Sequence, residues 1–166
     1  MAYRGVFGAF PYAARESDSW LFRSYALVSV VVGGGLALLF AFGLVVLVAQ
    51  TAAITGGSLT LSRAFYVVVG LFIVAPVIAP TLLVARRHRR QGSTRRYDAA
   101  LALAGYLLVA SLYVALVITI PTGQQEAPTG AFAPAVATLY ALPSVAAVAP
   151  PLVGIGTIWV AHRLAR

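Results

Sequence analysis

The sequence contains no cysteine and no lysine, and only 10% of its 166 residues are charged. The absence of cysteine excludes disulfides, thiolate metal sites and cysteine nucleophiles. A typical soluble domain has about 25% charged residues. A chain this short would therefore lack the polar side chains needed to cover a water-exposed surface. The composition excludes an ordinary cytosolic enzyme, a disordered tail and a collagen-like fibre.

Four long apolar segments make up most of the chain, in which 61% of the residues are hydrophobic. A helix needs about 20 largely apolar residues to cross about 30 Å of hydrocarbon. Lipid-exposed strands must close into a barrel and alternate in polarity, which these continuous apolar runs do not. The sequence therefore predicts an all-α fold, a four-helix transmembrane bundle within one integral membrane domain, residues 1–166. The predicted spans are about 25–49, 64–85, 99–120 and 134–161.

Arginine is distributed unevenly around these spans. With four spans, both termini and the segment between the second and third spans lie on one side of the membrane. That side carries eleven of the twelve arginines, and the other side carries Arg63. Because basic residues concentrate on the cytoplasmic side, both termini are predicted to be cytoplasmic in a multi-pass protein of the cell membrane. The N-terminal segment 1–23 lies either on the inner membrane surface or docked under the bundle.

The predicted cytoplasmic loop 86–98 has the highest charge density of the chain. One interpretation is a topology anchor, and the other is a contact site for anionic lipid headgroups or for an acidic partner. An arginine near an anionic membrane surface contributes about 1 kcal/mol to binding. A nucleic-acid role is disfavoured because the loop is short and has no aromatic residue between its arginines. The candidate contact residues are Arg86, Arg87, Arg89, Arg90, Arg95 and Arg96.

Five prolines fall in the interior of the second and fourth predicted spans. Proline removes a helical hydrogen bond and usually bends the helix. Each is interpreted as a helix kink, which is either a simple bend or an ion-coordinating break of the kind found in transporters. The predicted kinks are at Pro76, Pro80, Pro143, Pro150 and Pro151.

Residues near the ends of the spans have predicted local roles. Asp98 is predicted to cap the third span, and Ser62 the second. Pro11 argues against one continuous helix in the N-terminal segment. Aromatic side chains near the span ends predict an interfacial belt, and they include Trp20, Phe22, Tyr25, Tyr97 and Trp159.

Patterns that carry catalysis or cofactor binding are not found in the sequence. The spans contain no acid or base for a proton relay. His88 and His162 lie at span ends, so they do not match haem ligands that face each other at depth. Mid-span serines have no histidine or lysine base at the same depth. We therefore predict no catalytic residue, no cofactor and no metal site, and we expect the protein not to be an enzyme.

Three segments carry a resemblance to a known group of proteins: residues 3–12 (YRGVFGAFPY), 18–25 (DSWLFRSY) and 84–90 (VARRHRR). They resemble segments of small, uncharacterised four-helix membrane proteins from halophilic archaea. The resemblance spans nearly the whole chain and brings no functional motif. It implies that the arginines act at molar salt, where screening falls to about 3 Å and attraction works by contact.

Two main hypotheses for the function follow. The favoured one is a non-enzymatic scaffold or accessory subunit that contacts lipid headgroups or a partner through its Arg-rich loop. Its expected partners are membrane lipids and either a second copy of the chain or another membrane protein, with no nucleic acid. The alternative is a small oligomeric transporter or channel with Pro-broken second and fourth helices. A third hypothesis, a membrane enzyme acting on lipid, rests only on location.

Overall fold

A computed structural model describes residues 5–52 and 57–165, and all regular structure in these ranges is helical. The all-α prediction is therefore confirmed for the described chain. The elements are α1 (Gly5–Glu16), α2 (Trp20–Gln50), α3 (Gly57–Gln91), α4 (Arg95–Ile118), η1 (Thr122–Gln124), α5 (Ala133–Tyr140), η2 (Ser144–Val148) and α6 (Ala149–Leu164).

Four helical segments are long and apolar enough to cross a membrane. They are Trp20–Gln50, Thr60–Gln91, Arg95–Ile118 and Ser144–Leu164. Large apolar side chains on these helices are exposed, including Leu39 (68%) and Phe72 (71%). A soluble monomer rarely leaves so much continuous apolar surface uncovered. The exposed faces are those that a lipid environment would cover.

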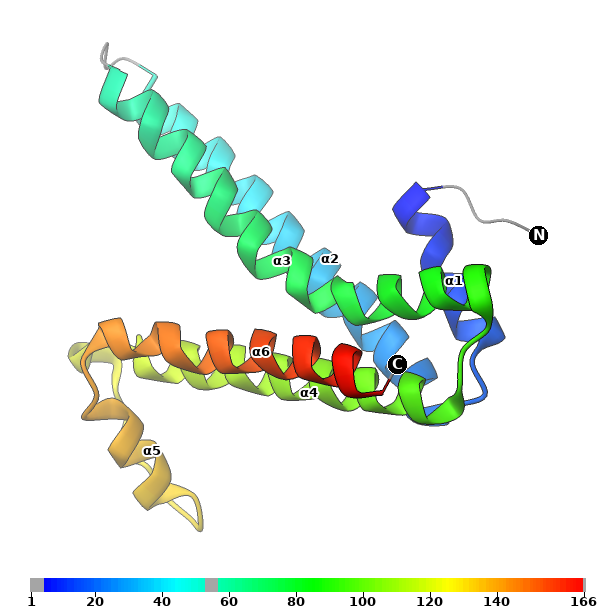
Figure 1. Cartoon of the computed structure of the whole chain (residues 1–166). Helices are drawn as coiled ribbons and strands as arrows, with labels where there is room; N and C mark the ends of the chain where they lie inside the picture. The colour runs from blue at the N-terminus through cyan, green and yellow to red at the C-terminus, as the bar shows by residue number, and fades with distance from the viewer. Residues whose placement is uncertain (1–4, 53–56, 166) are drawn as a thin grey trace.

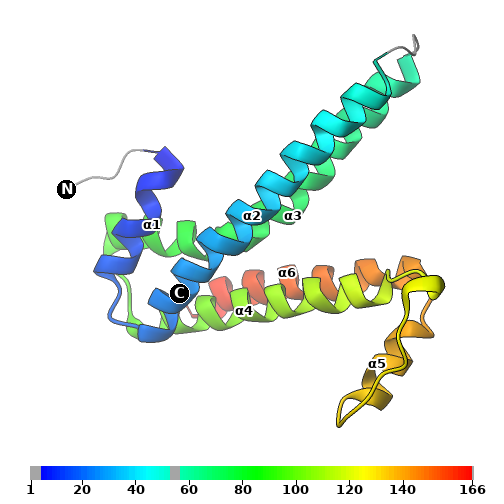
Figure 2. The same cartoon turned by 180° about the vertical axis from the view of Figure 1, so that it is seen from behind.

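The long helices form two antiparallel hairpins, α2 with α3 and α4 with α6 (Figures 1 and 2). The hairpins meet at the end of the molecule that carries α1 and the C-terminal turn of α6, and they diverge toward their tips. The structure therefore differs from a bundle whose four helices pack along their whole length. We call the shared end the basic end, because the arginines of residues 86–96 lie there.

The predicted fourth span, 134–161, is not one helix. Pro143 precedes the 3-10 helix η2, and α5 points away from α6 (Figure 1). Pro150 and Pro151 lie in the first turn of α6. Proline is compatible with that position because the first N–H groups of a helix have no partner within it. These three prolines therefore separate and start helices, and the prediction that they kink one helix is wrong.

Pro76 and Pro80 lie inside α3, as predicted. The helix continues through both and changes direction over its last turns (Figure 1). Ser29 of α2 and Thr81 of α3 share a hydrogen bond of 3.0 Å beside this bend. The Tyr25 hydroxyl donates to the carbonyl oxygen of Val77 at 2.6 Å. A proline ring weakens helical hydrogen bonding in the preceding turn, so α2 supports α3 where its own backbone bonding is poorest.

The N-terminal segment is docked against the basic end. α1 is one helix that contains Pro11, so the expectation of a broken segment is wrong. Ala9 and Ala13 share one face of α1 and are buried, and α1 packs on α3. Phe7 remains exposed. Small side chains at i and i+4 allow this close packing.

Several aromatic residues of the predicted interfacial belt are instead core residues. Phe22, Tyr25 and Tyr97 are fully buried where the hairpins meet. Trp20 and Trp159 are exposed, as a belt requires. The predicted cap of the second span is also wrong, because α3 begins at Gly57 and Ser62 lies inside it.

Candidate functional site

The arginines of the predicted loop are mostly helical. Arg86, Arg87, Arg89 and Arg90 belong to the last turns of α3, and Arg95 and Arg96 to the first turn of α4. Only residues 92–94 connect the two helices. The expected loop 86–98 is therefore a tight turn between two basic helix ends.

Local sequence explains this turn. Gly92 has a φ of +77°, the left-handed conformation that commonly terminates a helix. The Thr94 side chain accepts a hydrogen bond from the backbone N–H of Tyr97 and caps α4. Basic residues at the C-terminal end of α3 also interact favourably with its dipole. The turn thus holds the basic residues of both helices close together.

Asp98 is buried at this turn and does not act as the predicted cap. Its side chain is 1% exposed and accepts hydrogen bonds from the Ser17 and Ser93 hydroxyls, each at 2.6 Å. His88 Nε2 lies 2.9 Å from Asp98 Oδ2. A buried carboxylate is costly unless its oxygens are bonded. These contacts join the α1–α2 connection to the ends of α3 and α4.

Asp98 and its partners Ser17, Ser93 and His88 include the residue types of a catalytic triad, but they are connected in a different order. In a serine hydrolase the histidine lies between the serine and the carboxylate. Here the carboxylate is central, because both serines and His88 contact Asp98. The serine protons are therefore directed at the carboxylate, and the arrangement holds helices together.

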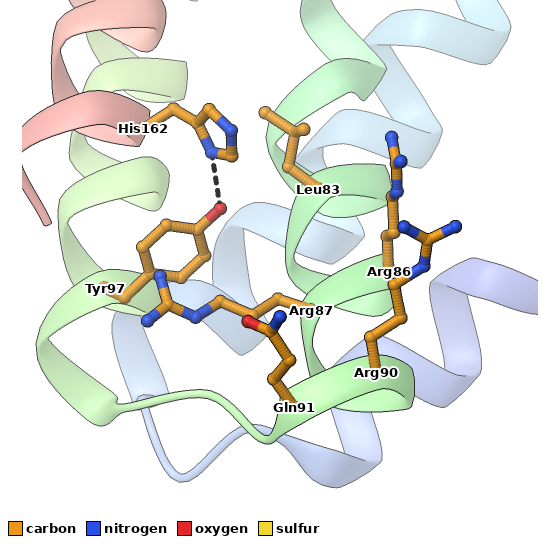
Figure 3. Close-up of a pocket in the computed structure, with 7 residues that line it drawn as sticks. All are labelled: Leu83, Arg86, Arg87, Arg90, Gln91, Tyr97 and His162. Carbon is orange, nitrogen blue, oxygen red and sulfur yellow. Dashed lines mark hydrogen bonds between the residues drawn. The ribbon is translucent and has the colours of Figure 1, made fainter. Parts of the chain in front are cut away.

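Arg87 crosses from α3 to the ring of Tyr97. Its guanidinium carbon lies 4.1 Å from the ring centroid, a cation–π contact. The Tyr97 hydroxyl and His162 Nδ1 share a hydrogen bond of 2.7 Å (Figure 3). Arg87, Tyr97 and His162 come from α3, α4 and α6, so the basic end joins both hairpins through this stack.

A cavity of about 340 Å³ opens beside this stack (Figure 3). We call it the arginine cavity. Its lining residues are Leu83, Arg86, Arg87, Arg90, Gln91, Tyr97 and His162.

Positive charge is concentrated at the arginine cavity. Arg86, Arg87 and Arg90 form no ion pair with any described residue. Nε and Nη1 of Arg87 are buried without a hydrogen-bond partner among those residues. Arg86 and Arg90 are four residues apart on one helix face, where like charges repel. An anion in the cavity would reduce this repulsion and accept hydrogen bonds from guanidinium groups.

The structure brings together only part of the predicted contact set. Arg86, Arg87 and Arg90 line the cavity, whereas Arg89, Arg95 and Arg96 do not. Sequence reasoning missed Tyr97 and His162, which it placed at span ends without joining them. A tyrosine directly after an arginine pair, and a histidine at the C-terminal end of the last span, were the available signals.

Within residues 5–52 and 57–165, no group of three or more His, Cys, Asp or Glu side chains is arranged to hold a metal ion. A family model described as a domain of unknown function, DUF8056, matches residues 1–166. No curated protein and no solved structure matches the chain. The origin in halophilic archaea stays a prediction.

Proposed function

Since the chain belongs to the DUF8056 family, whose function is unknown, we propose that it is a non-enzymatic multi-pass membrane protein that contacts anionic lipid headgroups. The contact surface is the basic end, and the role is that of a scaffold or accessory subunit. A membrane location is supported by the four helices that are long and apolar enough to cross a bilayer.

The observation that carries this proposal is the set of three arginines around the arginine cavity. None of the three forms an ion pair with a described residue. Guanidinium groups bind phosphate through paired, charge-assisted hydrogen bonds. A cluster of basic residues directly beside membrane-spanning helices is typical of lipid-headgroup contact. On this proposal the basic end is cytoplasmic, in agreement with the arginine distribution.

The transporter hypothesis lacks a comparable observation. Pro150 and Pro151 start α6 and do not break it. The Ser111 hydroxyl donates to the carbonyl oxygen of Leu108 in its own helix. The Tyr106 and Ser24 hydroxyls share a hydrogen bond of 2.9 Å between α4 and α2. The Tyr106–Ser24 bond links two helices and the Ser111 bond lies within α4, so these hydroxyls have structural partners, and the scaffold or accessory role is the function that we propose.

Thermal unfolding in mild detergent tests the lipid contact. Added phosphatidylglycerol is expected to raise the midpoint of the wild-type protein more than added phosphatidylcholine does, because only the first has a net negative charge. A variant with all six candidate arginines changed to glutamine is expected to lose this difference. Equal stabilisation of the wild type by both lipids would contradict the proposal.

Purification in the same detergent tests the accessory role. A second copy or another membrane protein is expected to co-purify with the wild-type chain. A monomer without a partner and without lipid dependence would overturn the proposed function as a whole.

A further inference from the structure

An apolar groove continues from the arginine cavity along the space between the two hairpins. It has a volume of about 750 Å³ and lies between α3 and α6. Leu83 and His162 line both the cavity and the groove, so the two are contiguous. The remaining lining residues are Leu71, Phe72, Ala75, Pro76, Ala79, Leu152, Ile155, Ile158 and Trp159.

The groove and the cavity together have the chemistry of an amphiphile site. The groove wall is apolar except at its His162 end, whereas the cavity next to it carries three arginines. From Leu71 to Leu83, α3 extends about 18 Å at 1.5 Å per residue. Half of a hydrocarbon core is about 15 Å thick. The groove therefore has the length of an acyl chain in one leaflet, with the positive charge where its headgroup would be.

We infer that the protein binds one anionic phospholipid molecule from the surrounding bilayer, with its phosphate in the arginine cavity and an acyl chain in the α3–α6 groove. This inference rests on the proposed function and specifies its ligand and position. Arg87 is the main headgroup residue, because two of its nitrogens have no hydrogen-bond partner in the described part of the chain and Tyr97 holds its guanidinium beside the cavity. Arg87 lies one helical turn after Leu83 in α3, and Leu83 lines both the cavity and the groove.

The divergence of the hairpins agrees with such a ligand. α3 and α6 belong to different hairpins and face each other across the groove. An acyl chain in the groove would make dispersion contacts with both of its walls. It would thereby link the two hairpins, whose direct protein contacts are concentrated at the basic end.

Native mass spectrometry of the full chain released from phosphatidylglycerol nanodiscs tests the inference. The wild-type protein is expected to retain one phosphatidylglycerol per chain. Arg87→Gln is expected to weaken retention about tenfold, because it removes a charge-assisted contact with phosphate. Arg15→Gln is the control, since it removes the same charge from an exposed position of α1 outside the cavity.

A second pair of variants tests the groove. Ala75→Trp fills the groove and is expected to reduce lipid retention, whereas Leu39→Trp, on an exposed face of α2, is expected to leave it unchanged. Helicity and a single gel-filtration peak confirm that each variant folds. Inorganic phosphate at millimolar concentration is the probe for a free anion and is expected not to displace the lipid.

The outcomes separate this inference from the proposed function. Loss of retention in both Arg87→Gln and Ala75→Trp, with both controls intact, supports one lipid in the joined site. Sensitivity to Arg87→Gln alone, or displacement by inorganic phosphate, overturns the lipid assignment. If Arg87→Gln and Arg15→Gln behave alike while the six-arginine variant loses its phosphatidylglycerol preference, this site is refuted and the proposed headgroup contact stands.

Discussion

Ser17, in the connection between α1 and α2, donates a hydrogen bond of 2.6 Å to Oδ2 of Asp98 in α4, 81 residues later. Both side chains are buried. The bond ties the N-terminal segment to the basic end, because Ser17 follows α1 directly and Asp98 lies in the first turn of α4. The N-terminal segment is thus part of the folded core at this end.

Removal of the Asp98 carboxylate is expected to destabilise the protein strongly. Asp98→Ala leaves the buried hydroxyl of Ser17 and the half-buried hydroxyl of Ser93 without their acceptor. We expect a loss of about 3 kcal/mol in the free energy of unfolding. Unfolding of the detergent-solubilised protein by titration with a denaturing detergent measures the loss. Asp18→Ala, at an exposed position, is the control, and equal losses in the two variants would contradict the assigned role.

Removal of the hydrogen bond between Tyr25 and Val77 is expected to lower the stability by a smaller amount. Tyr25→Phe keeps the ring in the core and removes only the hydroxyl that donates to the Val77 carbonyl oxygen. The expected loss in the free energy of unfolding is about 1 kcal/mol. The same titration applies, with Tyr113→Phe as the exposed counterpart. An unchanged stability in the Tyr25 variant would show that this bond does not support the bend of α3.

Alanine substitutions at two glycines of α6 are expected to change the free energy of unfolding in opposite directions. A methyl group at Gly154 would lie 2.9 Å from the α-carbon of Leu108, whereas one at Gly156 meets no atom within 4 Å. Gly154→Ala is expected to lower the free energy of unfolding by about 2 kcal/mol, because α4 and α6 must separate. Gly156→Ala is expected to raise it by up to about 1 kcal/mol through helix propensity. Equal effects of the two substitutions in the titration would refute the close approach of α4 and α6.

The proposed orientation can be tested with single cysteines, since the natural sequence has none. Gln124→Cys lies in the α4–α5 connection, far from the basic end, and Glu16→Cys ends α1 at the basic end. A membrane-impermeant maleimide is expected to label Gln124→Cys in intact cells and Glu16→Cys only after permeabilisation. The reverse pattern would place the basic end outside the cell and exclude contact with the cytoplasmic leaflet.

Much of the fold could be predicted because its signals are local in sequence. The helical segments of residues 20–50, 60–91 and 95–118 agree with the apolar runs to within several residues at most of their ends. The predictions that were wrong by more than a few residues concern the roles of prolines, such as Pro11, and of Asp98. Pro11 is accommodated inside α1 because the segment is held by packing on α3, and Asp98 is drawn into the core because Ser17, His88 and Ser93 surround it.

The candidate site could be predicted only in part. Arg86, Arg87 and Arg90 were recognisable as charges beside a membrane-spanning segment, since charge density is visible in sequence. Their separation from Arg89, Arg95 and Arg96 depends on which helix face adjoins α4 and α6. That face is set by the bend of α3 and by the way the two hairpins meet at the basic end, and neither can be inferred from hydropathy.

The sequence by itself determined that the chain is helical, that four segments are long and apolar enough to cross a bilayer, and that arginine gathers near their ends. These properties follow from the apolar content of short windows and from spacing along the chain. Only the tertiary structure decided that the hairpins diverge, that Tyr97 joins Arg87 to His162, and that an apolar groove meets the arginine cavity. Such contacts depend on how side chains from distant segments pack against one another, and a helix surface in an apolar sequence offers many faces of nearly equal hydrophobicity for that packing.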